Sequence, residues 1–212
     1  MLNNLLIAIL LPIMGELNTV RHLVAMNEVS EYLLVALASN EIAEKVKEGK
    51  ESFFQAFNPK SSLEARAHIA IASYTAKERM EERLEKWIQN ICNLQSSFSV
   101  TLNNYSGFPP HTIYLRVQES EPFAKLGNAL KMLDGFMEMN DCPSIQLFTR
   151  HYMTVAGQLP ESVYEVAIKE YARKSFHASF RVDRLSLMKR NAYTSYQIIN
   201  TFILPSGGPA TE

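Results

Sequence analysis

The feature that most constrains the fold is a series of elements that occurs twice along the chain. Short runs of alternating apolar residues, typical of half-buried strands, are separated by longer runs with an apolar residue every three or four positions, typical of amphipathic helices. Residues 32–103 give the order strand, helix, strand, helix, strand, and residues 112–190 give it again. Two such units facing each other would leave a cleft between their third elements, a common place for a ligand.

The boundaries of these elements follow from the same periodicities. We expect strands at 32–37, 66–73, 98–103, 112–117, 148–156, 176–190 and 194–204, and helices at about 40–56, 77–92, 122–138 and 160–173. The turn-forming run YSGFPPH (105–111) separates the two units. In the run 176–190 the apolar parity changes near Asp183 and Arg184, which predicts a bulge or break there.

These elements predict an α+β fold with two lobes, about 31–105 and 106–205, in one domain over residues 31–205. Antiparallel sheets would face a central cleft and helices would lie outside. With 212 residues, 47% of them hydrophobic, the chain is long enough to bury a substantial core. The net charge of -1 means that attraction for nucleic acid must come from a local basic patch.

Cysteine and histidine usage argues against disulfides and metals. Cys92 and Cys142 lack CxxC spacing, which favours a reducing, cytoplasmic setting. The five histidines have no spacing typical of metal ligands, so we expect neither a metal nor another cofactor. We also expect the protein to be a monomer.

The two chain ends are interpreted from composition. The apolar run LLIAILLPIM (5–14) is about half the length of a membrane-spanning helix, and Pro12 interrupts it. A secretory signal is the alternative, but no Lys or Arg precedes the run. We therefore expect residues 1–30 to be an N-terminal extension that packs on the domain, or the product of an upstream start codon, and residues 206–212 to be a flexible tail.

Four motifs follow one another in the predicted domain: AHIAIAS, SGFPPHTIYLRV, RHYMTVAGQLPE and FHASFRVDRLSLMKR. Their order and spacing resemble the two-histidine phosphoesterase superfamily, in particular its 2′-5′ RNA ligase-like (LigT-like) members. The resemblance implies metal-independent hydrolysis or formation of bonds at 2′,3′-cyclic or 2′,5′-linked phosphates. In that chemistry a neutral imidazole activates the attacking oxygen, an imidazolium protonates the leaving oxygen, and two hydroxyls hold phosphate oxygens.

The resemblance assigns catalytic positions residue by residue. His68 matches the first histidine, but Ala70 stands where the first hydroxyl belongs. The family's run Arg-Pro-His-x-Thr-x-Ala aligns with residues 150–156, so Tyr152 takes the place of the second histidine and Thr154 keeps the second hydroxyl. Each of the two motifs has lost one of its two functional groups.

His151 is the other candidate for the second histidine. It shares strand parity with Met153 and Val155, an apolar set expected to face the core, whereas Tyr152 shares parity with Thr154. A one-residue bulge at 150–151 is the alternative that would turn His151 into the cleft.

Further residues of the cleft are candidates for contact with substrate. Arg116, Arg150, Lys189 and Arg190 could form an anion-binding rim, although each is also typical of an ordinary surface charge. Tyr74 and Tyr114 could stack on a nucleobase, although tyrosines in strands usually pack in the core.

Two functions remain open. A phenol with a reference pKa of about 10 is a poor replacement for imidazole at pH 7. We therefore predict a cleft that binds a nucleotide or RNA end with a 2′,3′-cyclic or 2′,5′-linked phosphate, with catalysis weak or lost. The alternative is an active metal-independent phosphoesterase in which His68 works alone while Tyr152 and Thr154 hold the phosphate.

Overall fold

The computed structural model describes residues 28–57, 66–191 and 194–206. Its strands are β1 (Val29–Leu37), β2 (His68–Lys77), β3 (Phe98–Phe108), β4 (Thr112–Val117), β5 (Gln146–Leu147), β6 (Tyr152–Ala156), β7 (His177–Val182), β8 (Arg184–Arg190) and β9 (Gln197–Ile203). Its helices are α2 (Asn40–Phe57), α3 (Glu81–Asn93), α4 (Glu121–Leu130), α5 (Asp134–Glu138) and α6 (Glu161–Tyr171), with 3₁₀ turns η1 (Glu78–Met80) and η2 (Lys131–Leu133). The repeated order of strands and helices is confirmed.

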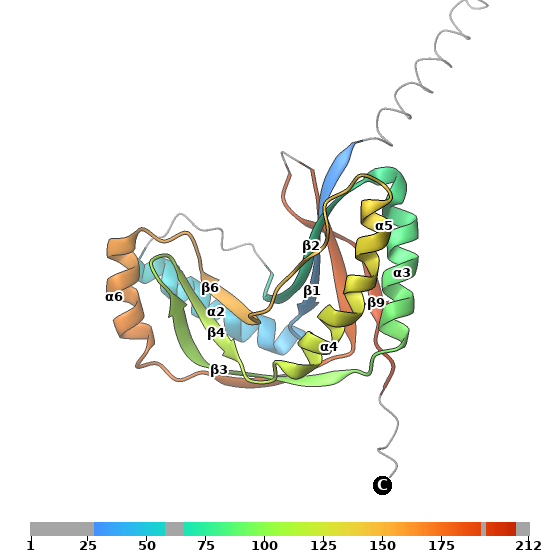
Figure 1. Cartoon of the computed structure of the whole chain (residues 1–212). Coiled ribbons are helices and arrows are strands. Elements are labelled where there is room, and N and C mark those ends of the chain that lie inside the picture. Colours follow the sequence, from blue (N-terminus) through green and yellow to red (C-terminus); the bar gives the residue numbers. More distant parts are fainter. Residues whose placement is uncertain (1–27, 58–65, 192–193, 207–212) are drawn as a thin grey trace, which may run out of the picture.

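The strands form one antiparallel sheet in the order β7-β3-β4-β6-β2-β1-β8-β9, with β5 pairing to β2. The sheet curls, so that its two halves stand at an angle to each other around a concave face (Figure 1). We call them the β4 half-sheet (β7, β3, β4 and β6) and the β1 half-sheet (β5, β2, β1, β8 and β9). Each half-sheet combines strands from both predicted units, because β3 of the first unit pairs with β4 and β7 of the second, while β8 of the second unit pairs with β1 of the first.

The helices cover the outside of the curled sheet. Helices α3, α4 and α5 lie along the β1 half-sheet, whereas α2 and α6 lie against the β4 half-sheet (Figure 1). Phe53 of α2 and Tyr171 of α6 pack there with ring centroids 5.1 Å apart. This arrangement confirms the predicted α+β fold with antiparallel strands inside and helices outside.

Helix α2 shows how the sequence sets this packing. Ile42, Val46, Lys50 and Phe53 are buried at helical spacing and form one stripe toward the sheet. On the solvent side, Lys45 Nζ lies 2.8 Å from Glu41 Oε1, one turn earlier. The stripe thus includes a lysine among apolar residues, and burial lowers the pKa of its ammonium group.

Strand β3 is longer than predicted. The expectation that residues 105–111 form a turn was wrong for residues 105–108, which continue β3 as far as Phe108. A register shift between Asn103 and Tyr105 accommodates Asn104, whose φ of 54° places it in the left-handed region. Only the Pro109–His111 segment turns, and it contains a cis Pro109–Pro110 peptide bond.

The segment expected as one strand over 148–156 is also divided. The chain advances six residues from Leu147 to Met153, while the opposite strand β2 advances three from Ala72 to Ile69. The three additional residues leave the ladder, so β6 begins only at Tyr152. The predicted break near Asp183 is confirmed, because β7 ends at Val182 and β8 begins at Arg184.

Residues 1–27 and 207–212, which make up nearly all of the expected extension and tail, lie outside the described residues. Among the residues that the structure describes, every helix is too short or too polar to span a lipid bilayer.

Candidate functional site

The two half-sheets meet where β2 pairs with β6, and the register there fixes which side chains enter the cleft. Ile69 lies opposite Met153, and both are completely buried on the helix-covered face. Successive strand residues point to opposite faces, so the flanking residues of each strand lie on the concave face, away from the helices. Those residues are His68 and Ala70 on β2, and Tyr152 and Thr154 on β6.

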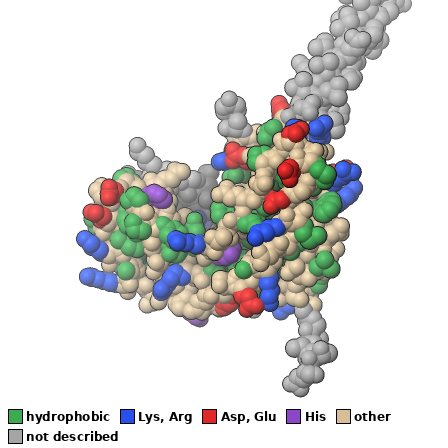
Figure 2. Space-filling view, viewed as in Figure 1, with side chains coloured by type: hydrophobic (Ala, Val, Ile, Leu, Met, Phe, Trp, Pro, Cys, Tyr) green, Lys and Arg blue, Asp and Glu red, His purple; other side chains and the backbone are tan. Residues whose placement is uncertain are grey.

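Because β2 and β6 run antiparallel, each cleft-facing residue of β2 lies across from a cleft-facing residue of β6. One step from the Ile69–Met153 pair, His68 falls across from Thr154 and Ala70 falls across from Tyr152. Thr154 is exposed, and His68 and Tyr152 are partly exposed. The structure therefore brings together all four positions that the sequence singled out, with one imidazole among them. Figure 2 shows the molecule hollowed between its two halves.

His68 is held in one tautomer by the segment that precedes its strand. Its Nδ1 lies 2.7 Å from the backbone oxygen of Arg66. A carbonyl oxygen can only accept, so Nδ1–H donates this bond and Nε2 carries the lone pair of the neutral ring. Burial lowers the pKa of His68 below its usual 6.5, and the charge of Lys50 lowers this pKa further, while the bond to Arg66 opposes both effects. At neutral pH His68 is thus an acceptor or base.

Tyr152 is surrounded by aromatic side chains from the neighbouring strands. Its ring centroid lies 5.0 Å from that of Phe108 on β3 and 5.0 Å from that of Tyr114 on β4, and Phe108 and Tyr114 stack at 4.3 Å. The guanidinium carbon of Arg150 lies 5.7 Å from the centroid of the Phe108 ring. Phe108, Gln146, Leu147, Phe148, Thr149, Arg150 and Tyr152 line a cavity of about 320 Å³ here.

The predicted basic rim is assembled only in part. Arg116 pairs with Tyr152 across the strands, so it shares the cleft face, and its Nε donates to the backbone oxygen of Asn103. Lys189 instead lies on the helix-covered side, where its Nζ is 2.7 Å from Glu78 and 2.8 Å from Glu81.

Arg190 is also committed to a carboxylate. Its Nη2 lies 2.6 Å from Glu31 Oε2, and its guanidinium covers the ring of Tyr196. Tyr74, considered as a base-stacking residue, is buried on the helix-covered face, where it stacks on Tyr32. These two residues are therefore not free to bind a ligand in the way the sequence suggested.

His151 leaves the ladder just before β6 and turns away from the cleft. Its ring stacks on Phe123 of α4, with centroids 4.5 Å apart. Among the described residues, neither ring nitrogen finds a hydrogen-bond partner of good geometry. Burial lowers the pKa of His151 below 6.5, although the nearby carbonyl of Phe148 opposes this effect. The chain does bulge before β6, but the bulge turns the His151 ring toward Phe123 of α4 instead of into the cleft.

Replacing His151 by Phe is expected to preserve or raise stability, by up to about 1 kcal/mol, because unpaired buried nitrogens disappear while the ring contact stays. The pKa of His151 is near 6.5 in the unfolded chain and lower in the folded protein, so below pH 6.5 the unfolded chain binds the proton more readily. Acidification below pH 6.5 should therefore destabilise the natural protein. His151→Phe should lessen that loss. Urea denaturation at pH 8 and pH 5 measures both effects, and a loss above about 1 kcal/mol at pH 8 would contradict this placement.

The sequence interpretation missed one residue of the site, Phe108, and one residue outside it that acts on His68, Lys50. Phe108 was assigned to a turn, because Gly107 and Pro109 flank it. Lys50 acts on His68 through its charge, and its place eight residues after Ile42 on the apolar stripe of α2 was the signal that could have revealed its burial. Within the described ranges, no three His, Cys, Asp or Glu side chains gather in a way that could hold a metal ion.

The curled antiparallel sheet places the protein in a class of two-lobed α+β proteins. Its candidate ligand cleft lies where β2 pairs with β6 and joins the two half-sheets. Residues 38–194 match the sequence model of the 2′-5′ RNA ligase superfamily, and the chain belongs to that family. No curated protein matches the sequence. The family predicted from the short motifs is thus confirmed.

Solved structures share the fold at low sequence identity. The Escherichia coli LigT structure complexed with 3′-AMP is 16% identical with a TM-score of 0.63, and the match covers 84% of this chain and 99% of LigT. LigT complexed with NADP+ is 17% identical with a TM-score of 0.59, over 84% and 99% of the two chains. A protein of Thermus thermophilus, TT0787, is 16% identical with a TM-score of 0.57, over 84% and 100%.

Proposed function

We propose that the cleft binds a nucleotide or an RNA end through a 2′,3′-cyclic or 2′,5′-linked phosphate, and that catalysis there is weak or lost. The observation that carries this proposal is the reciprocal set at the β2–β6 junction, in which His68 faces Thr154 while Ala70 faces Tyr152. One imidazole and one hydroxyl remain to hold a phosphate. LigT, which shares the fold, has been solved in complex with 3′-AMP.

The weak catalysis follows from the roles that phosphodiester cleavage requires. One group must take a proton from the attacking oxygen while another gives a proton to the leaving oxygen. His68 suits the first role, because its pKa is lowered and its Nδ1 is already engaged. The second role falls to the position of Tyr152, and a phenol is a far weaker acid than imidazolium. Loss of a positioned acid costs about 10²–10⁴ in rate.

The alternative is an active metal-independent phosphoesterase in which His68 works alone. The retention of His68 opposite Thr154 favours it. Incubation with 2′,3′-cyclic nucleotides and 2′,5′-linked oligonucleotides tests it, and turnover must disappear in His68→Ala. We place either function in the cytoplasm, since Cys92 and Cys142 are free thiols, and we propose that the protein acts as a monomer.

Binding of 2′,3′-cyclic AMP, measured by calorimetric titration, is expected to strengthen about fivefold between pH 8 and pH 5. The free protein protonates His68 only below pH 6.5, and a bound anion favours the protonated ring, so affinity rises as pH falls. The size reflects replacement of a neutral hydrogen bond by a charge-assisted one. A cyclic phosphodiester keeps a single negative charge over this range, so its own titration does not contribute.

His68→Gln should abolish this pH dependence while retaining a hydrogen-bonding side chain. His151→Phe is the matched control, because it also removes a histidine of lowered pKa but from the face turned away from the cleft. The control should keep the full pH dependence. The absence of binding at millimolar 2′,3′-cyclic AMP at both pH values would contradict the proposed function.

A further inference from the structure

We propose that Phe108, Tyr114 and Tyr152 form a base-stacking wall, so that the cleft selects ligands carrying a nucleobase beside the phosphate. Tyr152 then contributes to binding through its ring, in addition to occupying the place of a catalytic histidine. This inference rests on the proposed function and names the part of the ligand that the cleft recognises.

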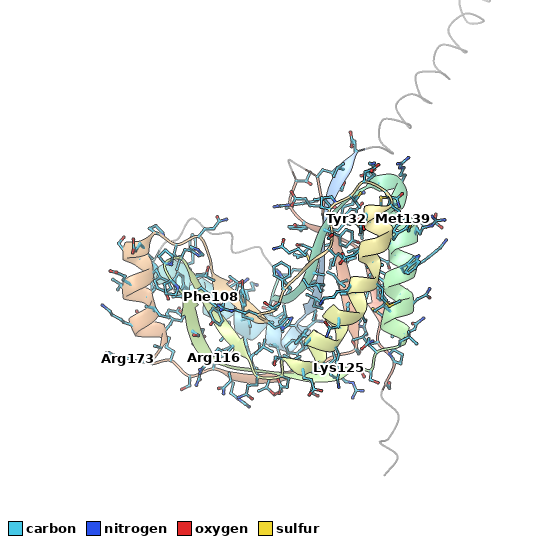
Figure 3. All side chains as sticks on the ribbon, in the orientation of Figure 1. Tyr32, Phe108, Arg116, Lys125, Met139 and Arg173 are labelled. Atoms are coloured by element: carbon cyan, nitrogen blue, oxygen red, sulfur yellow. The ribbon has the colours of Figure 1, made fainter. Side chains whose placement is uncertain are left out.

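The wall is built by three adjacent strands of the β4 half-sheet. Ser106 pairs with Tyr114, and Phe108 lies two residues farther along the same face of β3. Tyr114 in turn pairs with Thr154, two residues from Tyr152 on β6. The pairing therefore places all three rings on the cleft face, where Figure 3 labels Phe108 on the half of the molecule that carries α6.

The rings support one another without being fully covered. Phe108 stacks on Tyr114 with an angle of 24° between their planes, and the Tyr152 ring meets the Phe108 ring edge-on at 73°. All three side chains remain partly exposed at the cleft. Apolar ring surface held rigid in a cleft is the kind of platform on which proteins stack the bases of single-stranded nucleic acids.

The cavity beside Phe108 and Tyr152 has the size and the groups for one base. Its volume of about 320 Å³ lies near the lower end of the range of roughly 300–1,000 Å³ for ligand pockets, which suits a single nucleotide. Gln146 and Thr149 give it polar groups that could bond the edge of a base. A base stacked on Phe108 would take the place that the exposed guanidinium of Arg150 holds over that ring, and Arg150 would move outward to stack on the outer face of the base.

The base-stacking wall also lies at a suitable distance from His68 and Thr154, the two residues proposed to hold the phosphate. Tyr152 and Thr154 are two residues apart on β6, a separation of about 7 Å along an extended strand. The sugar of a single nucleotide bridges such a separation. A base on the wall would thus leave its phosphate near His68 and Thr154.

Calorimetric titration with 3′-AMP, ribose 5-phosphate and inorganic phosphate tests the inference on the natural protein. Base–aromatic stacking corresponds to about 5- to 150-fold in affinity, so 3′-AMP should bind at least fivefold more tightly than ribose 5-phosphate. Equal affinities for these two probes would overturn the base-stacking wall while leaving phosphate binding intact. Failure of all three probes to bind would instead overturn the proposed function.

Two variants of Tyr152 distinguish the contribution of its ring to binding from that of its hydroxyl group. Tyr152→Phe keeps the ring and Tyr152→Leu removes it, so the Phe variant should bind 3′-AMP at least fivefold more tightly than the Leu variant, with equal affinity for inorganic phosphate. Equal binding of 3′-AMP by the two variants would overturn the inference. The melting temperature of each variant verifies folding, and the comparison of probes on the natural protein needs no variant.

The contribution of Arg150 is tested against a matched arginine. Arg150→Met should weaken 3′-AMP binding severalfold. Arg173→Met makes the same change of charge two residues after the end of α6, outside the residues that line the cavity, and should leave binding unchanged; Figure 3 labels both Arg173 and Phe108. Equal effects of the two variants would show that general charge, and not stacking on the wall, explains the loss.

Discussion

The double variant Tyr152→His/Ala70→Thr is expected to hydrolyse 2′,3′-cyclic AMP about 10²–10⁴-fold faster than the natural protein. The substitutions restore an imidazole and a hydroxyl at opposite positions of the β2–β6 junction, across from each other and beside His68 and Thr154. Both positions face the cleft and belong to strands whose opposite faces are fully buried, so the new side chains need not disturb the core. Release of 2′- or 3′-AMP from the cyclic substrate measures the rate.

Two controls test whether the gain, the faster hydrolysis by the double variant, comes from the restored imidazole beside His68. His68→Ala in the double variant should abolish the gain, because both imidazoles are needed. Tyr114→His adds a histidine to the same face at a position one strand away, and should not produce it. If the double variant folds and binds 3′-AMP but gives no turnover, Tyr152 does not occupy the position of the second catalytic histidine.

Ile69→Ala is expected to lower the free energy of unfolding by about 2–5 kcal/mol. Ile69 is completely buried where β2 pairs with β6, opposite the equally buried Met153. Truncation leaves a cavity between the two half-sheets, where neither strand can close it without moving the register. Urea denaturation followed by circular dichroism gives the change.

Two isoleucine variants calibrate this loss. Ile69→Val removes a single methylene group and should cost about 0.5–1.5 kcal/mol. Ile203→Ala, on the edge strand β9 where the side chain is 65% exposed, should change stability by no more than about 0.5 kcal/mol. If Ile69→Ala costs no more than Ile203→Ala, the half-sheets are not joined through a packed core at this point.

The periodicity of apolar residues predicted most of the helices and strands, because it shows which side chains of each segment face the core. The strand at 112–117 and the helix of α2 were placed within a residue of their observed ends. The errors lie where the ladder is irregular. At Asn104, and between Leu147 and Tyr152, extra residues interrupt the alternation, and no local signal tells a bulge from a turn.

The candidate site, too, was predictable only where local sequence decides which way a side chain points. Parity within one strand was enough to favour Tyr152 over His151 as the cleft residue. The partners of the basic residues were not predictable, because Lys189 meets Glu78 and Glu81 from another element, and Arg190 meets Glu31 across the sheet. Side chains so far apart in the sequence come together only after the strands have paired.

The sequence by itself determined the family, the order of the elements and the face on which His68, Tyr152 and Thr154 lie, because these depend on local spacing. Only the tertiary structure decided that His68 stands across from Thr154 and that Phe108 and Tyr114 surround Tyr152. Those neighbours depend on the register between strands distant in sequence, and a shift of one residue would exchange the cleft face for the core face.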